Sequence, residues 1–290
     1  MKPAPFQYHA PKTVDETLDL LAQYAGDDGR VIAGGQSLVP TMAFRLAKPR
    51  HLVDINGVSE LNYLEIKDGK LHIGAGIRHS AFEKPVDDGP LGWLLAEVVK
   101  DIAHQPIRTR GTFCGSIAHA DPASEWCAVA AAHDAEMVAE SLSGIRVIPA
   151  KTFFEGIMPT ALREDELLTE VRLPILSHDT YAGFAEFSRR GGDYAIAMAV
   201  ATYRLKGGIM SDMRIAIGGA EAAPRRITDA ERTLIGRPPN LGAFQAAAHA
   251  AVKSLDPLDD ENVSAEYRLG LVHTMVTRAL QNANPTGQNE

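Results

Sequence analysis

The chain has little cysteine, since only Cys114 and Cys127 occur among its 290 residues. Two cysteines are too few for a disulfide framework, and their spacing fits no zinc or iron–sulfur site built by this chain alone. Long apolar runs are also missing, so the sequence predicts no membrane span, and the start of the chain lacks the apolar stretch of a secretory signal. We therefore expect reduced thiols and a cytoplasmic protein.

Basic clusters are missing as well. The formal net charge is -8 and the sequence pI is about 5.7, which argues against nucleic acid or an anionic membrane as the main partner. No pair among the ten histidines has metal-ligand spacing, and neither a Gly-x-Ser-x-Gly elbow nor a lysine-bearing phosphate loop occurs. What is present, 45% hydrophobic and 23% charged residues, is typical of a globular protein of about two domains.

Local patterns predict a mixture of helices and strands. Thr13 and Glu16 form a capping box, which begins a helix that ends near Gly26. Apolar strands at 30–33 and 52–55 then give a β-loop-α-β order. The other expected elements are hairpins at 64–75 and 137–148, helices at 91–103 and 125–135, a strand at 170–174, a turn-like boundary at 175–180, strands at 194–205 and 213–218, and helices at 241–254 and 264–282.

A first glycine-containing loop, Ala33-Gly34-Gly35-Gln36-Ser37, follows the strand at 30–33. Consecutive backbone N–H groups without shielding Cβ atoms allow an anion to approach, and the Ser37 hydroxyl adds a donor, which suits a diphosphate. For a lone Gly-Gly pair, however, a tight turn that needs positive φ angles is the simpler explanation. Both interpretations stay open on this loop alone.

A second loop, Thr112-Phe113-Cys114-Gly115-Ser116, runs into a stretch of serine, histidine and aspartate among small residues that ends at Glu125. Polar side chains in a compact apolar neighbourhood need hydrogen-bond partners, which a ligand could provide. Ser124 and Glu125 are explained equally well by a plain helix N-cap. His119 is better explained as a structural histidine than as a catalytic base.

The third region of interest is a glycine turn, Arg190-Gly191-Gly192-Asp193-Tyr194, before a strand. An aromatic ring at a turn can stack on a planar cofactor, although it more often packs against a strand end. A further pair, Gly218-Gly219, follows an apolar strand and is best interpreted as a turn.

In this order and spacing, the three segments resemble the FAD-binding medium subunit of molybdenum hydroxylases. This is the family of the carbon monoxide dehydrogenase medium subunit and of the xanthine dehydrogenase FAD-binding subunit. The resemblance extends over essentially the whole chain. It includes Phe6 to Pro11, Ala33 to Pro40, Arg110 to Pro122, Asp165 to Pro174 and Arg190 to Tyr194.

The resemblance implies an α+β fold. A two-part FAD-binding domain of the vanillyl-alcohol-oxidase (PCMH) type would occupy 1–56 and 57–176, as an α/β subdomain and an α+β subdomain that enclose an extended FAD. A C-terminal α+β domain of the CO dehydrogenase flavoprotein type would occupy 177–290.

The resemblance also implies the cofactor contacts. The diphosphate would lie between Ile32–Leu38 on one side and Thr112, Gly115 and Ser116 on the other. Glu125 would lie toward the adenosine end, and Tyr194 with Asp193 near the isoalloxazine. The full expected set is Ile32, Ala33, Gly34, Gly35, Gln36, Ser37, Leu38, Ile102, Thr112, Cys114, Gly115, Ser116, Glu125, Leu168, Asp193 and Tyr194, with Ile102 and Leu168 as apolar neighbours of the cofactor.

Three positions depart from the family pattern. Cys114 stands where glycine is usual, so its backbone must tolerate a Cβ and its contact is the least certain. Ser116 replaces the usual asparagine, and Glu125 replaces the usual aspartate. Both side chains stay polar, but their lengths differ from those of the usual residues. The cysteine-bearing insertion that some relatives use for an extra iron–sulfur cluster is absent from the sequence.

The function implied is electron transfer through noncovalent FAD. A large subunit would carry molybdopterin, a small subunit would carry 2Fe–2S clusters, and the chain would work in a heterotrimer or a dimer of heterotrimers. Catalytic side chains and metal ligands are not expected on this chain. The alternatives are a self-sufficient flavin oxidase or reductase of the same superfamily, and a flavin-free binding protein with this fold.

Overall fold

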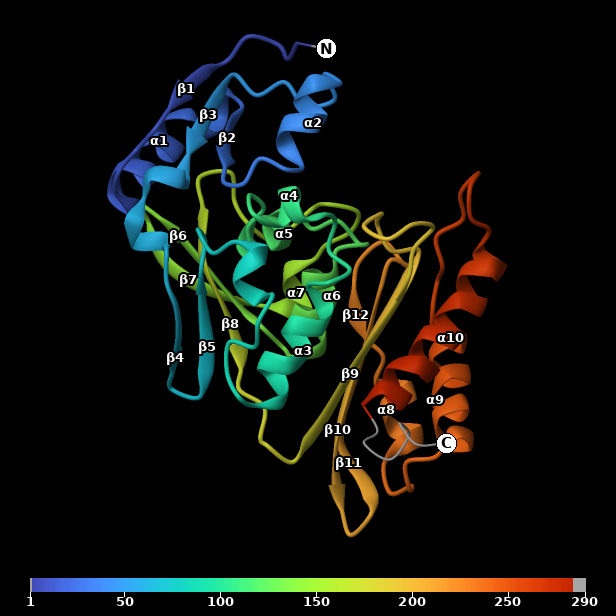
Figure 1. Ribbon diagram of the computed structural model, residues 1–290. Helices are drawn as coiled ribbons and strands as arrows, with labels where there is room; N and C mark the ends of the chain where they lie inside the picture. Colours follow the sequence, from blue (N-terminus) through green and yellow to red (C-terminus); the bar gives the residue numbers. More distant parts are fainter. Residues whose placement is uncertain (1, 284–290) are drawn as a thin grey trace.

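The computed structural model describes residues 2–283, which form three sheets in chain order (Figure 1). The N-terminal sheet has the order β1-β3-β2, the central sheet β4-β5-β8-β6-β7, and the C-terminal sheet β12-β11-β10-β9. One sheet falls in each of the three expected segments, while the boundaries at residues 56 and 176 stay a prediction. The mixture of helix and sheet agrees with the expected α+β class.

The N-terminal unit is a small parallel sheet with helices between its strands. Its capping box is altered: the Thr13 hydroxyl accepts from the Glu16 N–H at 3.1 Å, but the Glu16 carboxylate accepts from Lys12 rather than from Thr13. The strands pair in parallel because a helix or a long loop intervenes between them. The elements are β1 (Gln7–His9), α1 (Val14–Tyr24), β2 (Gly29–Ile32), α2 (Leu38–Ala43) and β3 (His51–Asp54).

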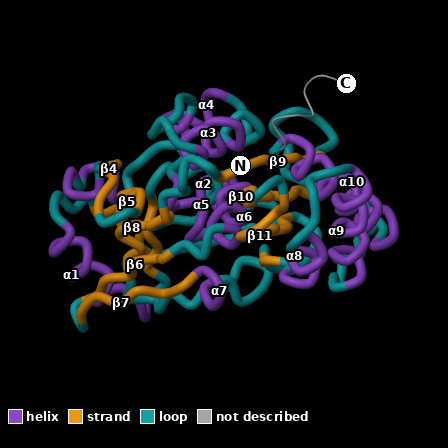
Figure 2. Tube along the Cα trace, turned by 90° about the horizontal axis from the view of Figure 1, so that it is seen from below, coloured by secondary structure: helices purple, strands orange, loops and turns teal. Residues whose placement is uncertain are grey.

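The central unit is a five-stranded antiparallel sheet with helices on the side that faces the C-terminal domain (Figures 1 and 2). Its strands are β4 (Leu64–Lys67), β5 (Lys70–Gly74), β6 (Glu136–Ser141), β7 (Gly144–Pro149) and β8 (Leu167–Pro174). Its helices are α3 (Pro90–Val98), α4 (Gln105–Arg108), α5 (Phe113–His119), α6 (Glu125–Ala132) and α7 (Ala150–Phe153).

The C-terminal sheet lies between two layers of helices. Its own α8 and α10 contact its strands, with α9 packed against these two helices, and α3 and α6 of the central unit contact the strands from the other side. Strand β10 shows this directly, because Met198 and Val200 pack into the central core while the alternating Ala197, Ala199 and Ala201 pack against the C-terminal helices. The elements are β9 (Thr180–Phe187), β10 (Ala197–Lys206), β11 (Ile209–Gly218), β12 (Arg225–Arg226), α8 (Thr228–Leu234), α9 (Leu241–Lys253) and α10 (Ala265–Asn282).

The structure corrects several local expectations. The helix expected to reach Ala103 ends at Val98, and Pro106 lies in the first turn of α4, where its missing N–H costs nothing, instead of ending a helix. Strand β9 and helix α8 were not expected. The stretch from Thr112 to Ser116, expected to be a loop, is the N-cap and first turn of α5. Among the described residues, no helix is both long enough and apolar enough to cross a membrane.

His133, at the end of α6, is a buried histidine whose two ring nitrogens have no hydrogen-bond partner among residues 2–283. Burial lowers its pKa to about 3, and Arg214 adds to this. Because the pKa in the folded state lies below that of the unfolded chain, the stabilisation is complete above about pH 6.5 and is lost as the pH falls below that value.

We expect His133→Leu to make stability less dependent on pH. Wild-type free energy of unfolding should fall below pH 6.5 by up to about 1.4 kcal/mol per pH unit from this residue alone. The leucine variant should lose that slope and be at least as stable at pH 5, because an unpartnered buried polar group is removed. Urea denaturation at several pH values measures both quantities, and an unchanged slope would contradict the assignment.

Candidate functional site

A cleft of about 650 Å³ lies between the N-terminal unit and the central unit. The end of β2 and the loop into α2 form one wall of the cleft, and the start of α5 forms the other. In Figure 1, α2 lies above α4 and α5. Twelve of the sixteen expected residues line this cleft. They are Ile32, Ala33, Gly34, Gly35, Gln36, Ser37, Leu38, Thr112, Cys114, Gly115, Ser116 and Leu168.

The first loop presents its backbone to the cleft. The N–H groups of Gly34, Gly35, Gln36 and Ser37 have no acceptor among the described residues. Gly35 has a φ of +69°, a left-handed conformation that favours glycine and turns successive N–H groups toward one point. The Gln36 side-chain amide donates to the Gly34 carbonyl at 2.8 Å and holds the turn. Such unpartnered donors form a cradle for an anion, and a diphosphate fits them.

Gly34 is required for a different reason, because the two walls of the cleft touch there. A Cβ at position 34 would lie 2.2 Å from the Arg110 carbonyl oxygen and 2.6 Å from the Gly111 Cα. Real Cβ atoms do not approach backbone so closely, so only glycine allows this contact. The pair of glycines thus serves two purposes, a turn at Gly35 and the approach of the opposite wall at Gly34.

Asn56 and Arg78 join the same two walls through side chains, and the sequence analysis missed both. The Asn56 amide donates to the Ala33 carbonyl at 2.7 Å, and Arg78 donates to the Asn56 side-chain oxygen at 2.5 Å and also to the Arg110 carbonyl. Burial lowers the pKa of Arg78, as does Arg110, while Asp54 opposes this. A sequence signal existed for Asn56, which lies two residues after Asp54, the polar end of the strand at 51–54.

The opposite wall is a capped helix start. The Thr112 hydroxyl accepts from the Gly115 N–H at 3.0 Å, and a Cβ on Gly115 would lie 2.6 Å from that hydroxyl. Cys114 is buried, and its thiol donates to the Ile73 carbonyl at 3.3 Å. Its Cβ is tolerated in place of glycine because the side chain packs into the core beneath the cleft. Burial also raises the pKa of the Cys114 thiol.

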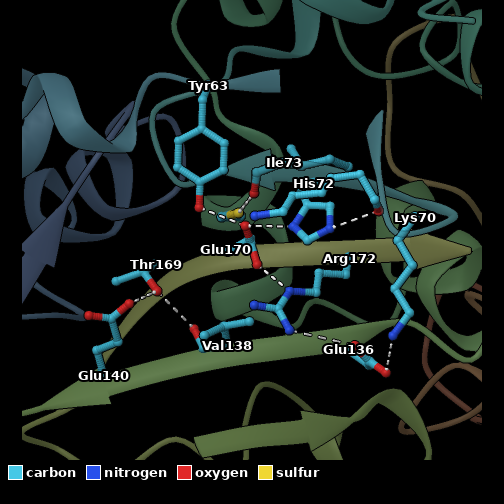
Figure 3. A network of polar contacts seen from close by, with 12 residues as sticks. Tyr63, Lys70, His72, Ile73, Glu136, Val138, Glu140, Thr169, Glu170 and Arg172 are labelled. Atoms are coloured by element: carbon cyan, nitrogen blue, oxygen red, sulfur yellow. Dashed lines mark hydrogen bonds and ion pairs between the residues drawn. The ribbon is translucent and has the colours of Figure 1, made fainter. Parts of the chain in front are cut away.

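Figure 3 shows a polar network on β5 and β8, and the Ile73 carbonyl that accepts from the Cys114 thiol belongs to β5. Glu170 is at the centre of the network and accepts from the Tyr63 hydroxyl at 2.8 Å, from Arg172, and from His72 with its Nδ1 at 3.0 Å. Burial alone would raise the pKa of Glu170, but these hydrogen bonds lower it. The polar groups of the network form hydrogen bonds with one another, so we interpret its role as structural. It stabilises β5, whose Ile73 carbonyl accepts from the Cys114 thiol.

His79 lines the cleft and was also missed. Its Nδ1 accepts from the Trp126 indole N–H at 2.9 Å, which leaves the proton of the neutral ring on Nε2. Burial lowers its pKa to about 4, with Arg78 and Arg108 adding to the effect. His79 is therefore a neutral, structurally fixed ring. His119 also lines the cleft, and no group of residues in the described part of the chain could hold a metal ion.

Four expected residues lie outside the cleft. Ile102 is buried in the core and is not a cleft-lining residue, because the chain turns away after α3 and its side chain packs inward. Asp193 and Tyr194 line a second hollow of about 560 Å³ on the C-terminal domain. The Tyr194 ring is 59% exposed, but its hydroxyl end adjoins the Ser37 hydroxyl. Tyr194 therefore stands at one end of the cleft.

Glu125 was expected toward the adenosine end and Tyr194 near the isoalloxazine, and both placements stay predictions. Burial raises the pKa of Tyr194, the carboxylates of Asp121 and Glu125 raise it further, and the Ser37 hydroxyl opposes them. Ser124 occupies the N-cap of α6, but its hydroxyl bonds to that of Ser116 at 3.1 Å instead of capping the helix.

Two family models match the chain. The FAD binding domain in molybdopterin dehydrogenase matches residues 4–176, and the CO dehydrogenase flavoprotein C-terminal domain matches residues 182–283. Together these matches bear out the α+β class with a two-part flavin domain and a separate C-terminal domain.

Individual relatives are similar over nearly their whole length. The alpha subunit of the 6-hydroxypseudooxynicotine dehydrogenase complex of Paenarthrobacter nicotinovorans is 42% identical, over 100% of this chain and 99% of the relative. The solved structure of carbon monoxide dehydrogenase from Hydrogenophaga pseudoflava has a TM-score of 0.93 at 38% identity, over 98% of both chains. That of quinoline 2-oxidoreductase from Pseudomonas putida 86 has a TM-score of 0.92 at 35% identity, over 99% of both.

Proposed function

The chain belongs to the family of FAD-binding medium subunits of molybdenum hydroxylases, and from that membership we propose that it is the electron-transfer subunit of such a complex. It binds FAD noncovalently, receives electrons from 2Fe–2S clusters on a small subunit and passes them to an external acceptor. Molybdopterin and the hydroxylation chemistry belong to a large subunit. The complex is a heterotrimer or a dimer of heterotrimers, and we place it in the cytoplasm.

The observation that carries this proposal is the cradle of unpartnered N–H groups from Gly34 to Ser37, facing the capped start of α5 across the cleft. Bound FAD supplies the redox chemistry, accepting electrons singly and delivering them in pairs. The chain's own residues bind and orient the cofactor. These separate roles of the cofactor and the chain agree with a site that offers hydrogen-bond donors and apolar walls for binding.

We assign the contacts as follows. The backbone of Ile32–Leu38 and the residues Thr112, Gly115 and Ser116 hold the diphosphate from opposite sides. Leu168 provides an apolar wall, and Cys114 contributes through its backbone. The isoalloxazine lies toward Tyr194 and Asp193, and Glu125 lies toward the adenosine end. Ile102 contributes by packing in the core and not by lining the cleft.

The test is the absorption spectrum of the full chain, purified with the polypeptides that accompany it. We expect a flavin spectrum, release of FAD by acid, and partners that contain molybdopterin and iron–sulfur clusters. Retention of the flavin after acid, with reduction by substrate in the isolated chain, would support a self-sufficient oxidase or reductase instead. A colourless chain that does not bind added FAD would support the flavin-free binding protein.

A further inference from the structure

Three large apolar side chains are exposed on α2 and on the turn that follows it. Val39, Phe44 and Leu46 are 51%, 67% and 81% exposed, whereas Met42 of the same helix is buried. We call these three exposed side chains the α2 surface. Single exposed apolar residues are ordinary, but a group of them on one short segment with a polar rim is typical of a surface that binds another protein.

The backbone of the α2 surface is fixed before any partner binds. α2 ends at Ala43, and Arg45 has a φ of +60°, a left-handed conformation that reverses the chain. The N–H groups of Leu46 and Ala47 then both donate to the Thr41 carbonyl, at 2.9 and 3.3 Å. Leu46 is thereby held beside α2, and binding needs little further ordering of the chain. In Figure 1, α2 lies at the edge of the molecule, beside the N-terminal segment.

The rim of the α2 surface is basic. Residues 29–53 contain no aspartate or glutamate, although the whole chain has a formal net charge of -8. Arg45 and Lys48 are exposed and have no carboxylate partner in the described part of the chain, unlike Arg50, which pairs with Asp27. The α2 surface therefore combines an apolar centre with positive charge around it.

The basic rim decides which kind of partner fits. The Arg45 Nε donates to the Lys2 carbonyl at 3.4 Å, so a further exposed lysine adjoins the rim. A second copy of the chain, related by a two-fold axis, would bring two basic rims together, and like charges across an interface are unfavourable. A partner with carboxylates around an apolar patch has the complementary charge. The α2 surface thus favours an acidic protein partner over a copy of itself.

The α2 surface is also the outer side of the cleft wall. A Cβ on Gly35 would lie 3.1 Å from the Val39 Cγ2, and the Val39 N–H donates to the Gly35 carbonyl at 3.0 Å. Leu38, the preceding residue, lines the cleft itself. Only the first turn of α2 therefore separates a partner on this surface from the contents of the cleft.

We propose that the α2 surface is the docking site of the iron–sulfur subunit, which contacts it through an apolar patch surrounded by carboxylates. This inference rests on the proposed function, which requires an electron donor close to the cofactor. Docking forms no covalent bond. It brings the donor to the wall that contains the first loop, where one thin layer of protein separates the donor from the cofactor.

The first experiment expresses the full chain together with the other subunits of the complex and measures how much iron–sulfur subunit co-purifies with it. Leu46→Glu should reduce that amount by about tenfold or more, because it places a negative charge at the apolar centre, facing carboxylates. Ile145→Glu is the matched control, since Ile145 is exposed on the edge strand β7 and should leave the amount unchanged. Urea denaturation should show that both variants are as stable as wild type, because neither side chain is buried.

The second experiment tests the charge of the rim by diluting the assembled complex at low salt and at about 0.5 M salt. The double variant Arg45→Glu with Lys48→Glu should have a roughly tenfold higher dissociation constant than wild type at low salt, and this difference should shrink at high salt. Arg237→Glu with Lys253→Glu makes the same change of net charge on exposed residues of the C-terminal domain and should behave as wild type. The double variant also provides a second test if Leu46→Glu folds poorly.

The outcomes separate this docking site from its alternatives. Wild-type assembly of Leu46→Glu and of the double variant, or an equal loss in the control variants, would overturn the proposal. A free wild-type chain that sediments as a dimer, and that Leu46→Glu makes monomeric without any effect on assembly, would show a contact between copies instead. A wild-type chain that co-purifies with no iron–sulfur subunit would refute the proposed function itself.

Discussion

Gly34→Ala is expected to weaken FAD binding by roughly five- to a hundredfold and to destabilise the junction between the two walls of the cleft. The added Cβ would lie 2.2 Å from the Arg110 carbonyl oxygen, so the first loop and the opposite wall must separate. Overpacking of this kind costs roughly 1–3 kcal/mol, and about 1.4 kcal/mol corresponds to a tenfold change in affinity. Flavin fluorescence titration of the full chain and urea denaturation measure the two effects.

Gly26→Ala is the matched control. Gly26 follows α1 on the same unit, its φ is not in the left-handed region, and nothing lies within 4 Å of where its Cβ would be. The control should bind FAD as wild type does. If Gly34→Ala also binds FAD with wild-type affinity, the contact between the walls does not shape the cofactor site, and the diphosphate must be held elsewhere.

Arg78→Met is expected to have the next largest effect, lowering FAD affinity by about tenfold. Methionine keeps most of the side-chain volume but removes the donors to the Asn56 side chain and to the Arg110 carbonyl. Leaving such acceptors unsatisfied costs about 1–3 kcal/mol. Because Asn56 in turn holds the Ala33 carbonyl, the first loop should lose its orientation as well as its contact with the opposite wall.

A double-mutant cycle with Asn56→Ala distinguishes this clamp from simple loss of charge. The two substitutions should be strongly non-additive, since each breaks the same connection between the walls. Arg232→Met is the control, because that arginine is exposed and pairs only with Asp229 on its own helix. Additive effects, or an equal loss in the control, would show that Arg78 acts on FAD through long-range charge alone.

Local sequence patterns suffice to predict those elements that depend on nearby residues. The capping threonine at 13, the hairpin of β4 and β5 and the two terminal helices depend on neighbours a few residues away, and all were placed within a few residues. Strand β9 was missed because its alanine and glycine residues have weak strand propensity, and its pairing with the next strand, β10, holds it in place. The short helix α5 was expected as a loop because its small polar residues have weak helix propensity, which Thr112 as N-cap overcomes.

For the site, the sequence by itself predicted which backbone segments carry the cofactor, through glycines at 34, 35 and 115. The structure adds that a Cβ would be obstructed at Gly34 and Gly115 and strained at Gly35. Only the tertiary structure decided what those glycines face. The closure of Asn56 and Arg78 across the cleft and the inward burial of Ile102 depend on contacts between segments that lie apart in the sequence. Such contacts depend on how the sheets and helices pack, and sequence periodicity carries no information about that packing.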